Sequence, residues 1–243
     1  MSSGSKHPTL RNIYGCNKDV NGNLHFLSEV SVMYPSGHGV VILNTETNSQ
    51  SFLPCAVSTH KITAMAMSSK RIAAIAETAD HAFVTLYNVD KRKKINTLKM
   101  PDCETIVSAA FSSDGKYLLT QGGAPTWSIV CWSVEKGKPV ANTVTNTDAY
   151  KQVANVSFHP EDSDVFCVSG NGVLKFFRIG DNTIKMISNG LHKREPQNFK
   201  SHTFLTKGSL VASTGTGELI LFKNFEWSRA VESSDQDDGV SID

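Results

Sequence analysis

A repeat of 45 residues constrains the fold of this chain more than any other feature of its sequence. Short apolar runs that read as strands carry a large apolar residue near their end, and these anchors recur at Ile42, Tyr87, Trp132, Phe177 and Phe222. Tyr87 follows Ile42 by 45 residues, and the three later steps have the same length. Four equal steps indicate five copies of one unit, which buries its faces by stacking on its neighbours.

Each repeat contains short apolar runs separated by polar or glycine-containing turns, which is typical of antiparallel strands joined by hairpins. In the second repeat the runs are residues 63–67, 71–76, 84–88 and 95–98. In the third, Asp114-Gly115 between two runs is a strong hairpin signal, because glycine takes a positive φ at no steric cost. Four strands in 40–45 residues is the period of a WD40 blade. The sequence therefore predicts an all-β, divergent WD40-type β-propeller of about five four-stranded blades, as part of a larger or incomplete propeller.

The blades are expected to fill residues 1–230, and the polar, acidic residues 231–243 are expected to be a disordered tail. The first blade is the least regular. Its strands are predicted at residues 24–26, 30–33, 40–44 and 51–53, with residues 10–14 as a candidate extra strand before them. The anchors are expected to pack between blades.

Charge and cysteine usage exclude several classes of protein. The net charge is +1, so no strong field draws the chain to nucleic acid or to a membrane surface. The five cysteines include no Cys-x-x-Cys pair, which argues against a zinc site and a disulfide framework. The start of the chain lacks the apolar core of a signal peptide, and no apolar run approaches the length of a membrane helix. We expect a reducing, intracellular location.

Catalytic and cofactor motifs are not found in the sequence. It contains neither a phosphate-binding glycine loop nor histidines at metal-ligand spacing. His60, His159 and His202 recur near blade starts, where we expect hydrogen bonds within the propeller. Cys131 and Cys167 fall on predicted buried strands and are expected to pack there. The sequence predicts no enzyme, no cofactor, no metal and no small-molecule substrate.

Two features are candidate partner contacts. Lys91, Arg92, Lys93 and Lys94 form a basic run in the turn between the anchor strand and the outer strand of the second blade. They form either a solvated turn, a contact for an acidic partner such as a tubulin surface or an acidic coiled coil, or a nuclear-import or RNA signal. Trp127 ends a long loop, where it either anchors an interface if exposed or folds back onto its own blade.

Several runs resemble the N-terminal WD40 propeller of the cilia- and flagella-associated protein 57 family, in order from about residue 10 to residue 222. They are Tyr34-Pro-Ser-Gly-His38, Phe111-Ser-Ser-Asp-Gly-Lys-Tyr-Leu-Leu119, Val156-Ser-Phe-His-Pro160, Cys167-Val-Ser-Gly-Asn-Gly-Val173, Glu195-Pro-Gln-Asn-Phe199 and Ser201-His-Thr203. The run from Glu195 is the most specific, because nothing in a generic blade requires it.

The resemblance implies a non-enzymatic axonemal scaffold that helps to place inner dynein arms on the doublet microtubules of motile cilia. It implies partners among inner dynein arm components and doublet microtubule-associated proteins, in the cytoskeleton of the cilium. The chain departs from the family in lacking heptad segments and in its degenerate Trp-Asp signature, since Ser133 follows Trp132. A fragment, a short isoform and a different mode of closure all stay open. The alternative function is a WD40 adaptor in nucleic-acid or translation machinery.

Overall fold

The computed structural model describes residues 12–53, 61–101, 103–148, 150–205 and 208–231. This part of the chain contains twenty strands, which pair into five antiparallel sheets of four strands each. The predicted all-β fold of five four-stranded blades is confirmed. None of the described residues forms a helix of the length and apolarity that crossing a bilayer would need.

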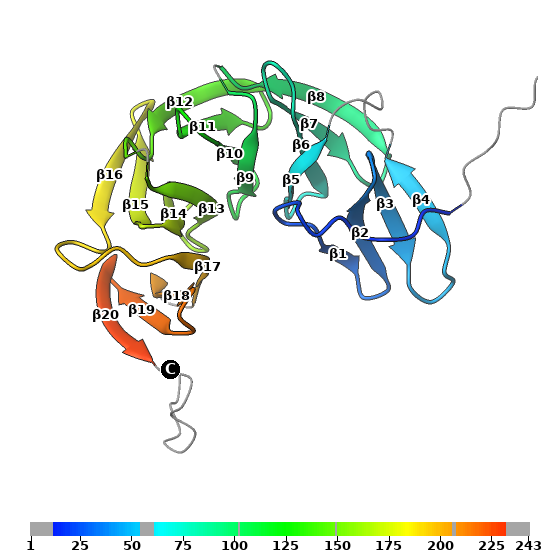
Figure 1. The fold of residues 1–243 in the computed structure, drawn as a ribbon. Helices are drawn as coiled ribbons and strands as arrows, with labels where there is room; N and C mark the ends of the chain where they lie inside the picture. Colours follow the sequence, from blue (N-terminus) through cyan, green and yellow to red (C-terminus); the bar gives the residue numbers. More distant parts are fainter. Residues whose placement is uncertain (1–11, 54–60, 102, 149, 206–207, 232–243) are drawn as a thin grey trace, which may run out of the picture.

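The blades follow one another along the chain, and in each blade the strands pair in chain order. Figure 1 shows the first strand of each blade on the inner side of an arc and the fourth on the outer side. The strands of blades 1 to 5 in turn are β1 (His25–Ser28), β2 (Ser31–Ser36), β3 (Gly39–Asn44), β4 (Gln50–Leu53); β5 (Ile62–Met67), β6 (Ile72–Glu77), β7 (Phe83–Asn88), β8 (Lys93–Lys99); β9 (Ile106–Phe111), β10 (Tyr117–Gly122), β11 (Ser128–Ser133), β12 (Lys138–Val144); β13 (Gln152–Phe158), β14 (Val165–Asn171), β15 (Val173–Gly180), β16 (Thr183–Asn189); and β17 (Phe199–Phe204), β18 (Leu210–Thr214), β19 (Leu219–Lys223), β20 (Glu226–Val231).

Because consecutive strands are antiparallel, the turns of a blade fall at two ends. The turns between first and second strands and between third and fourth strands share one end, which we call the hairpin end. Backbone bonds join such turns, for example from Val134 N to the Lys116 carbonyl. Asp114-Gly115 lies in one of them, where Gly115 has a φ of +66° and Ser112 Oγ contacts Asp114 Oδ1 at 2.7 Å. The other end, called the connection end, carries the links between blades.

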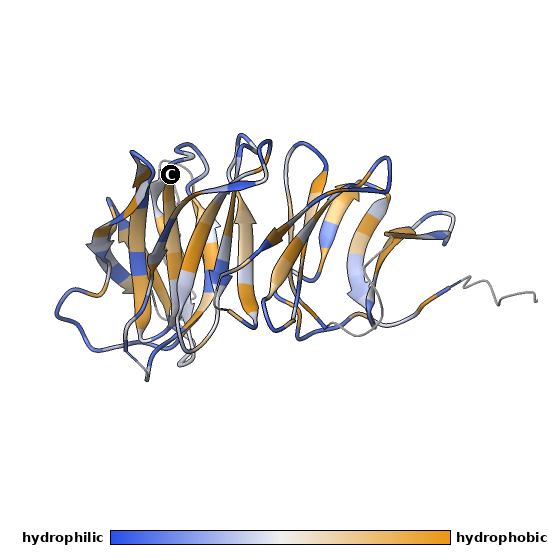
Figure 2. Ribbon diagram, turned by 90° about the horizontal axis from the view of Figure 1, so that it is seen from above, coloured by the Kyte–Doolittle hydropathy of each residue, from blue (hydrophilic) through white to orange (hydrophobic). Residues whose placement is uncertain are grey.

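The core of the protein lies between blades, in clusters that combine residues of neighbouring blades. Figure 2 shows hydrophobic residues along the strands and hydrophilic residues in many of the turns. Tyr87, Trp132, Phe177 and Phe222 are each at most 4% exposed and share a cluster with residues of the preceding blade. Trp132, for example, lies in a cluster with Leu86 of β7. The expectation that these anchors pack between blades is therefore confirmed for blades 2 to 5.

The first blade differs from the sequence-based alignment by one residue. Asn44 and Asn88 end β3 and β7, and each side-chain Oδ1 accepts a backbone N–H from the turn that follows. The residue equivalent to Tyr87 is therefore Leu43, and the first step is 44 residues rather than 45. A shift of one residue in a strand exchanges its two faces. Ile42 accordingly packs toward blade 2, in the cluster that contains Tyr87.

The opposite face of blade 1 has no preceding blade among the described residues. Phe26 on this face is 74% exposed. Residues before the blade bond to it, beginning with the Asn17 N–H, which donates to the Pro35 carbonyl. The backbone N–H of Ile13 donates to Gln50 Oε1 at 2.7 Å, and Gln50 Nε2 donates to the Ile13 carbonyl. The described part of the candidate strand at residues 10–14 is thus held by a side chain and is not a strand. Figure 1 shows an opening in the arc between blades 1 and 5; residues 232–243 of the expected acidic tail lie outside the described residues.

Candidate interaction surfaces

The basic run lies at the hairpin end of blade 2, in the predicted turn. Lys91 and Arg92 are the second half of the turn at residues 89–92, and Lys93 and Lys94 begin β8. The turn is closed by a bond from the Arg92 N–H to the Val89 carbonyl, and Arg92 has a φ of +50°. The four basic residues are exposed. The run is therefore accessible to a partner, and whether it binds one stays a prediction.

A second basic turn lies beside the first and was not singled out from the sequence. Lys136 and Lys138 flank Gly137 in the turn between β11 and β12, and both are exposed. A Cβ on Gly137 would stand 1.8 Å from Nδ2 of Asn96, so this turn contacts β8 of the neighbouring blade. The sequence does not show that these two turns are neighbours, because one whole repeat separates them along the chain. The contact between Gly137 and Asn96 shows it.

Trp127 does not occupy the exposed position that would make it an interface anchor. It is 8% exposed and packs in a core cluster with Ile129. Its backbone is also fixed, since its N–H donates to the Gly123 carbonyl and its own carbonyl accepts from Thr145 N–H and Oγ. Of the two arrangements expected for Trp127, the structure has the one in which the side chain folds into the propeller.

The inner strands carry a polar network centred on Asn21, a residue that sequence reasoning did not identify. The Asn21 backbone pairs with β5, and its side-chain amide donates to Asn155 Oδ1 at 2.9 Å. Ser108 Oγ donates to Asn21 Oδ1, and Asn155 Nδ2 donates to the Lys200 carbonyl. Asn21 thus connects to blades 2, 3 and 4, and Asn155 extends the network to blade 5. These neutral amides and hydroxyls satisfy one another, so the network is suited to holding the arc together.

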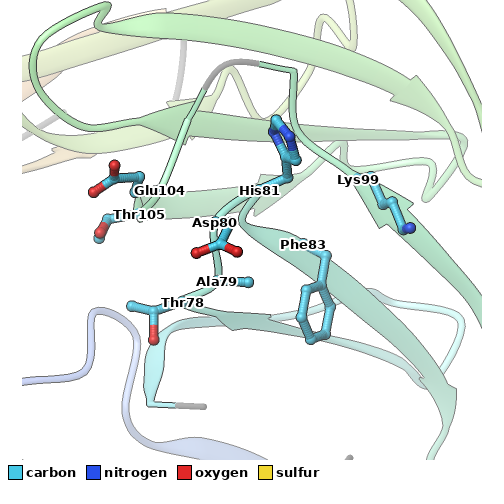
Figure 3. A pocket seen from close by; sticks show the side chains of 8 residues that line it. All are labelled: Thr78, Ala79, Asp80, His81, Phe83, Lys99, Glu104 and Thr105. Carbon is cyan, nitrogen blue, oxygen red and sulfur yellow. The ribbon is translucent and has the colours of Figure 1, made fainter.

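A shallow pocket opens at the connection end between blades 2 and 3. Its lining includes Asp80 and His81 from the turn between β6 and β7, Lys99 from β8 and Glu104 from the link to blade 3. Figure 3 shows these side chains spread around the pocket, with Glu104 on the side opposite Lys99. Within the described ranges, no group of three His, Cys, Asp or Glu residues is placed to hold a metal ion.

Two of the three singled-out histidines make hydrogen bonds within the propeller, as expected; His60 lies outside the described residues. His159 Nδ1 accepts the backbone N–H groups of Glu161 and Asp162, both at 3.1 Å. His202 reaches from blade 5 into blade 4, where Nε2 lies 2.7 Å from Ser157 Oγ and Nδ1 lies 2.6 Å from Ser169 Oγ. Burial of the ring lowers the pKa of His202 to about 4, although the residue as a whole keeps some exposure.

The segment Glu195-Pro-Gln-Asn-Phe199 links blades 4 and 5. The Gln197 carbonyl accepts the N–H of Gly172, in the turn between β14 and β15. The next carbonyl, from Asn198, accepts the N–H of Gly215, in the corresponding turn of blade 5. Phe199 is 1% exposed and packs in the cluster between the two blades. This segment therefore fastens two neighbouring blades at the connection end.

The buried cysteines are packing residues. Cys131 and Cys167 are fully buried, as the strand pattern predicted. Burial raises the pKa of Cys131 to about 12 and the pKa of Cys167 well above its usual value, because a thiolate is poorly solvated in an apolar setting. Neither thiol is suited to act as a nucleophile. Cys16 is exposed and Cys103 is buried.

Comparisons with known proteins give a consistent set of relatives. The chain is 30% identical over 220 residues to cilia- and flagella-associated protein 57 of Mus musculus, covering 87% of this chain and 17% of the relative. It is 23% identical to cilia- and flagella-associated protein 57 A of Tetrahymena thermophila, covering 96% of this chain and 23% of the relative. It is 22% identical to cilia- and flagella-associated protein 44 of Mus musculus, covering 88% of this chain and 12% of the relative.

No protein-family model matches the chain. The chain spans less than a quarter of the length of each of these three relatives. Because the likeness extends over most of the chain and its structure consists of WD40-type blades, the protein is a distant homologue of cilia- and flagella-associated proteins.

Proposed function

We propose that this protein is a non-enzymatic scaffold of the ciliary or flagellar axoneme, where it helps to position inner dynein arms on doublet microtubules. One observation carries the proposal: similarity over 87% of the chain to a protein named for its association with cilia and flagella. Further relatives, among them cilia- and flagella-associated protein 43 of Mus musculus, have the same kind of name. The dynein-arm assignment follows from the family that the sequence resembles.

The architecture supports a scaffold role. Five blades present turns at two ends, and turns are where such a rigid frame can bind several partners at once. The polar groups at the inner strands bond to one another, and the buried thiols are poor nucleophiles. Under this proposal the partners are axonemal proteins, including inner dynein arm components and doublet microtubule-associated proteins, and the protein resides in the cytoskeleton of the cilium.

Localisation of the tagged chain in a multiciliated or flagellated cell tests the proposal. Under the proposal, the chain enters cilia and stays on axonemes after detergent extraction. A five-blade segment of a non-ciliary propeller, carrying the same tag, is the matched control and should be extracted. A diffuse or nuclear signal for the chain would contradict the axonemal role and would favour an adaptor in nucleic-acid or translation machinery.

A further inference from the structure

The hairpin end of blades 2 and 3 carries two basic turns side by side. Asn96 of β8 contacts Gly137, whose neighbours in the chain are both lysines. Lys94 precedes Asn96 by two residues, a distance of about 7 Å along a strand. Lys94 therefore lies close to the second turn on the scale of the Debye length, ~8–10 Å at physiological salt, so the charges of the two turns reinforce each other. We call this surface the basic ridge; it consists of Lys91, Arg92, Lys93, Lys94, Lys136 and Lys138.

The positive charge of the basic ridge is poorly compensated. None of its six residues forms an ion pair within the part of the chain that the structure describes. The neighbouring Asp90 is bound to Arg71 at 2.7 Å. Asp90 and Glu135 are the acidic residues inside the two turns. Because Arg71 neutralises Asp90, the six basic residues and Glu135 leave a local charge of +5. The whole chain carries only +1, so the charge is concentrated on the ridge.

Apolar surface lies next to the ridge. Ile95, between Lys94 and Asn96, is 49% exposed, and Pro139 next to Lys138 is exposed as well. The anchor aromatics of these two blades, Tyr87 and Trp132, are buried and cannot stack on bases. Single-stranded nucleic acid is bound by basic grooves with exposed aromatic side chains. An exposed aliphatic side chain among cations instead fits a polypeptide that carries both carboxylates and an apolar residue.

We propose that the basic ridge binds an acidic polypeptide segment of a partner protein, whose carboxylates contact the lysines and whose apolar side chain packs on Ile95. The inference deepens the proposed scaffold function by naming the chemistry of one partner, and it rests on that function only for the cellular setting. Electrostatic complementarity of this kind raises the association rate and weakens steeply with salt.

Binding of a short labelled oligoglutamate peptide with a central leucine tests the proposal, measured by fluorescence anisotropy on the full chain at low ionic strength. K93E/K94E and K136E/K138E should each weaken binding by about tenfold, because attraction becomes repulsion at two positions. The matched control is K185E/K193E, which makes the same change of charge at exposed residues of β16 and the link to blade 5 and should leave binding nearly unchanged. Ile95→Ser should abolish the preference for the leucine-containing peptide over plain oligoglutamate.

Melting temperatures of the three charge-reversal variants should match the wild type, since the reversed residues are exposed. Equal loss of binding in K93E/K94E and K185E/K193E would overturn the proposal, as would tighter binding of an oligonucleotide than of the peptide. Axoneme retention of the wild type separates the two proposals: its loss refutes the scaffold function alone, whereas absent peptide binding with retention intact refutes the ridge alone.

Discussion

Acid should destabilise the seam between blades 4 and 5 through His202. The neutral ring bonds to Ser157 and Ser169, one ring nitrogen donating and the other accepting. Protonation would place a charge in this enclosed site, and for that reason the pKa of His202 falls from 6.5 to about 4. Below pH 6.5 the unfolded chain binds a proton at His202 that the folded chain does not bind until about pH 4. The stability of the fold therefore decreases as the pH falls through this window.

The pKa difference sets the magnitude of the effect. A shift of one unit corresponds to about 1.4 kcal/mol, so the full loss of unfolding free energy is about 3 kcal/mol. Between pH 7 and pH 5 the loss is about 2 kcal/mol, because the folded ring is still neutral at pH 5. These values are upper limits, since water can partly solvate the charged ring of the incompletely buried His202 and so reduce the loss of stability.

Urea unfolding of the wild type and of His202→Gln, followed by circular dichroism, checks the prediction. Glutamine retains a hydrogen-bonding side chain and does not titrate, so other acid-sensitive groups cancel in the difference between the two proteins. The stability advantage of the wild type should shrink by up to about 2 kcal/mol from pH 7 to pH 5. A difference that stays constant over this range would refute the reasoning.

Three further changes test the packing. Trp132→Ala should reduce the unfolding free energy by about 3–5 kcal/mol, because the side chain is 4% exposed and its Nε1 donates to Thr120 Oγ at 2.8 Å; the same change at half-buried Trp227 should cost less in urea unfolding. Gly170→Ala should reduce the unfolding free energy by about 1–3 kcal/mol, since the new Cβ would stand 2.0 Å from the Gln152 carbonyl oxygen. Its control is Gly180→Ala, where the Cβ would meet open space and the unfolding free energy should change by no more than about 0.5 kcal/mol in the same assay. A thiol reagent should label exposed Cys16 in the folded chain. The same reagent should label Cys131 only after unfolding, because the thiol is buried and its pKa is raised to about 12. Fast labelling of Cys131 in the folded chain would contradict its burial.

The blades were predictable because their information is local. Alternating apolar residues, hairpin turns and a fixed period each specify a strand or a turn without knowledge of distant contacts. The same local reasoning misplaced the first anchor, since Ile42 and Leu43 are both large and aliphatic and the sequence does not show which faces blade 2. The network at Asn21 could not be predicted either. It depends on residues up to 134 positions apart, which only the curvature of the arc brings together.

The segment that carries the most specific part of the resemblance to ciliary proteins has a structural role. In the segment Glu195-Pro-Gln-Asn-Phe199, two backbone carbonyls bond to turns of two blades and Phe199 fills the core between them. His202, three residues later, bonds back into blade 4. These residues thus join blades 4 and 5, and a likeness there indicates a shared seam rather than a shared partner. Specificity for a partner must then arise from exposed turns, which is why the basic ridge is the surface to test.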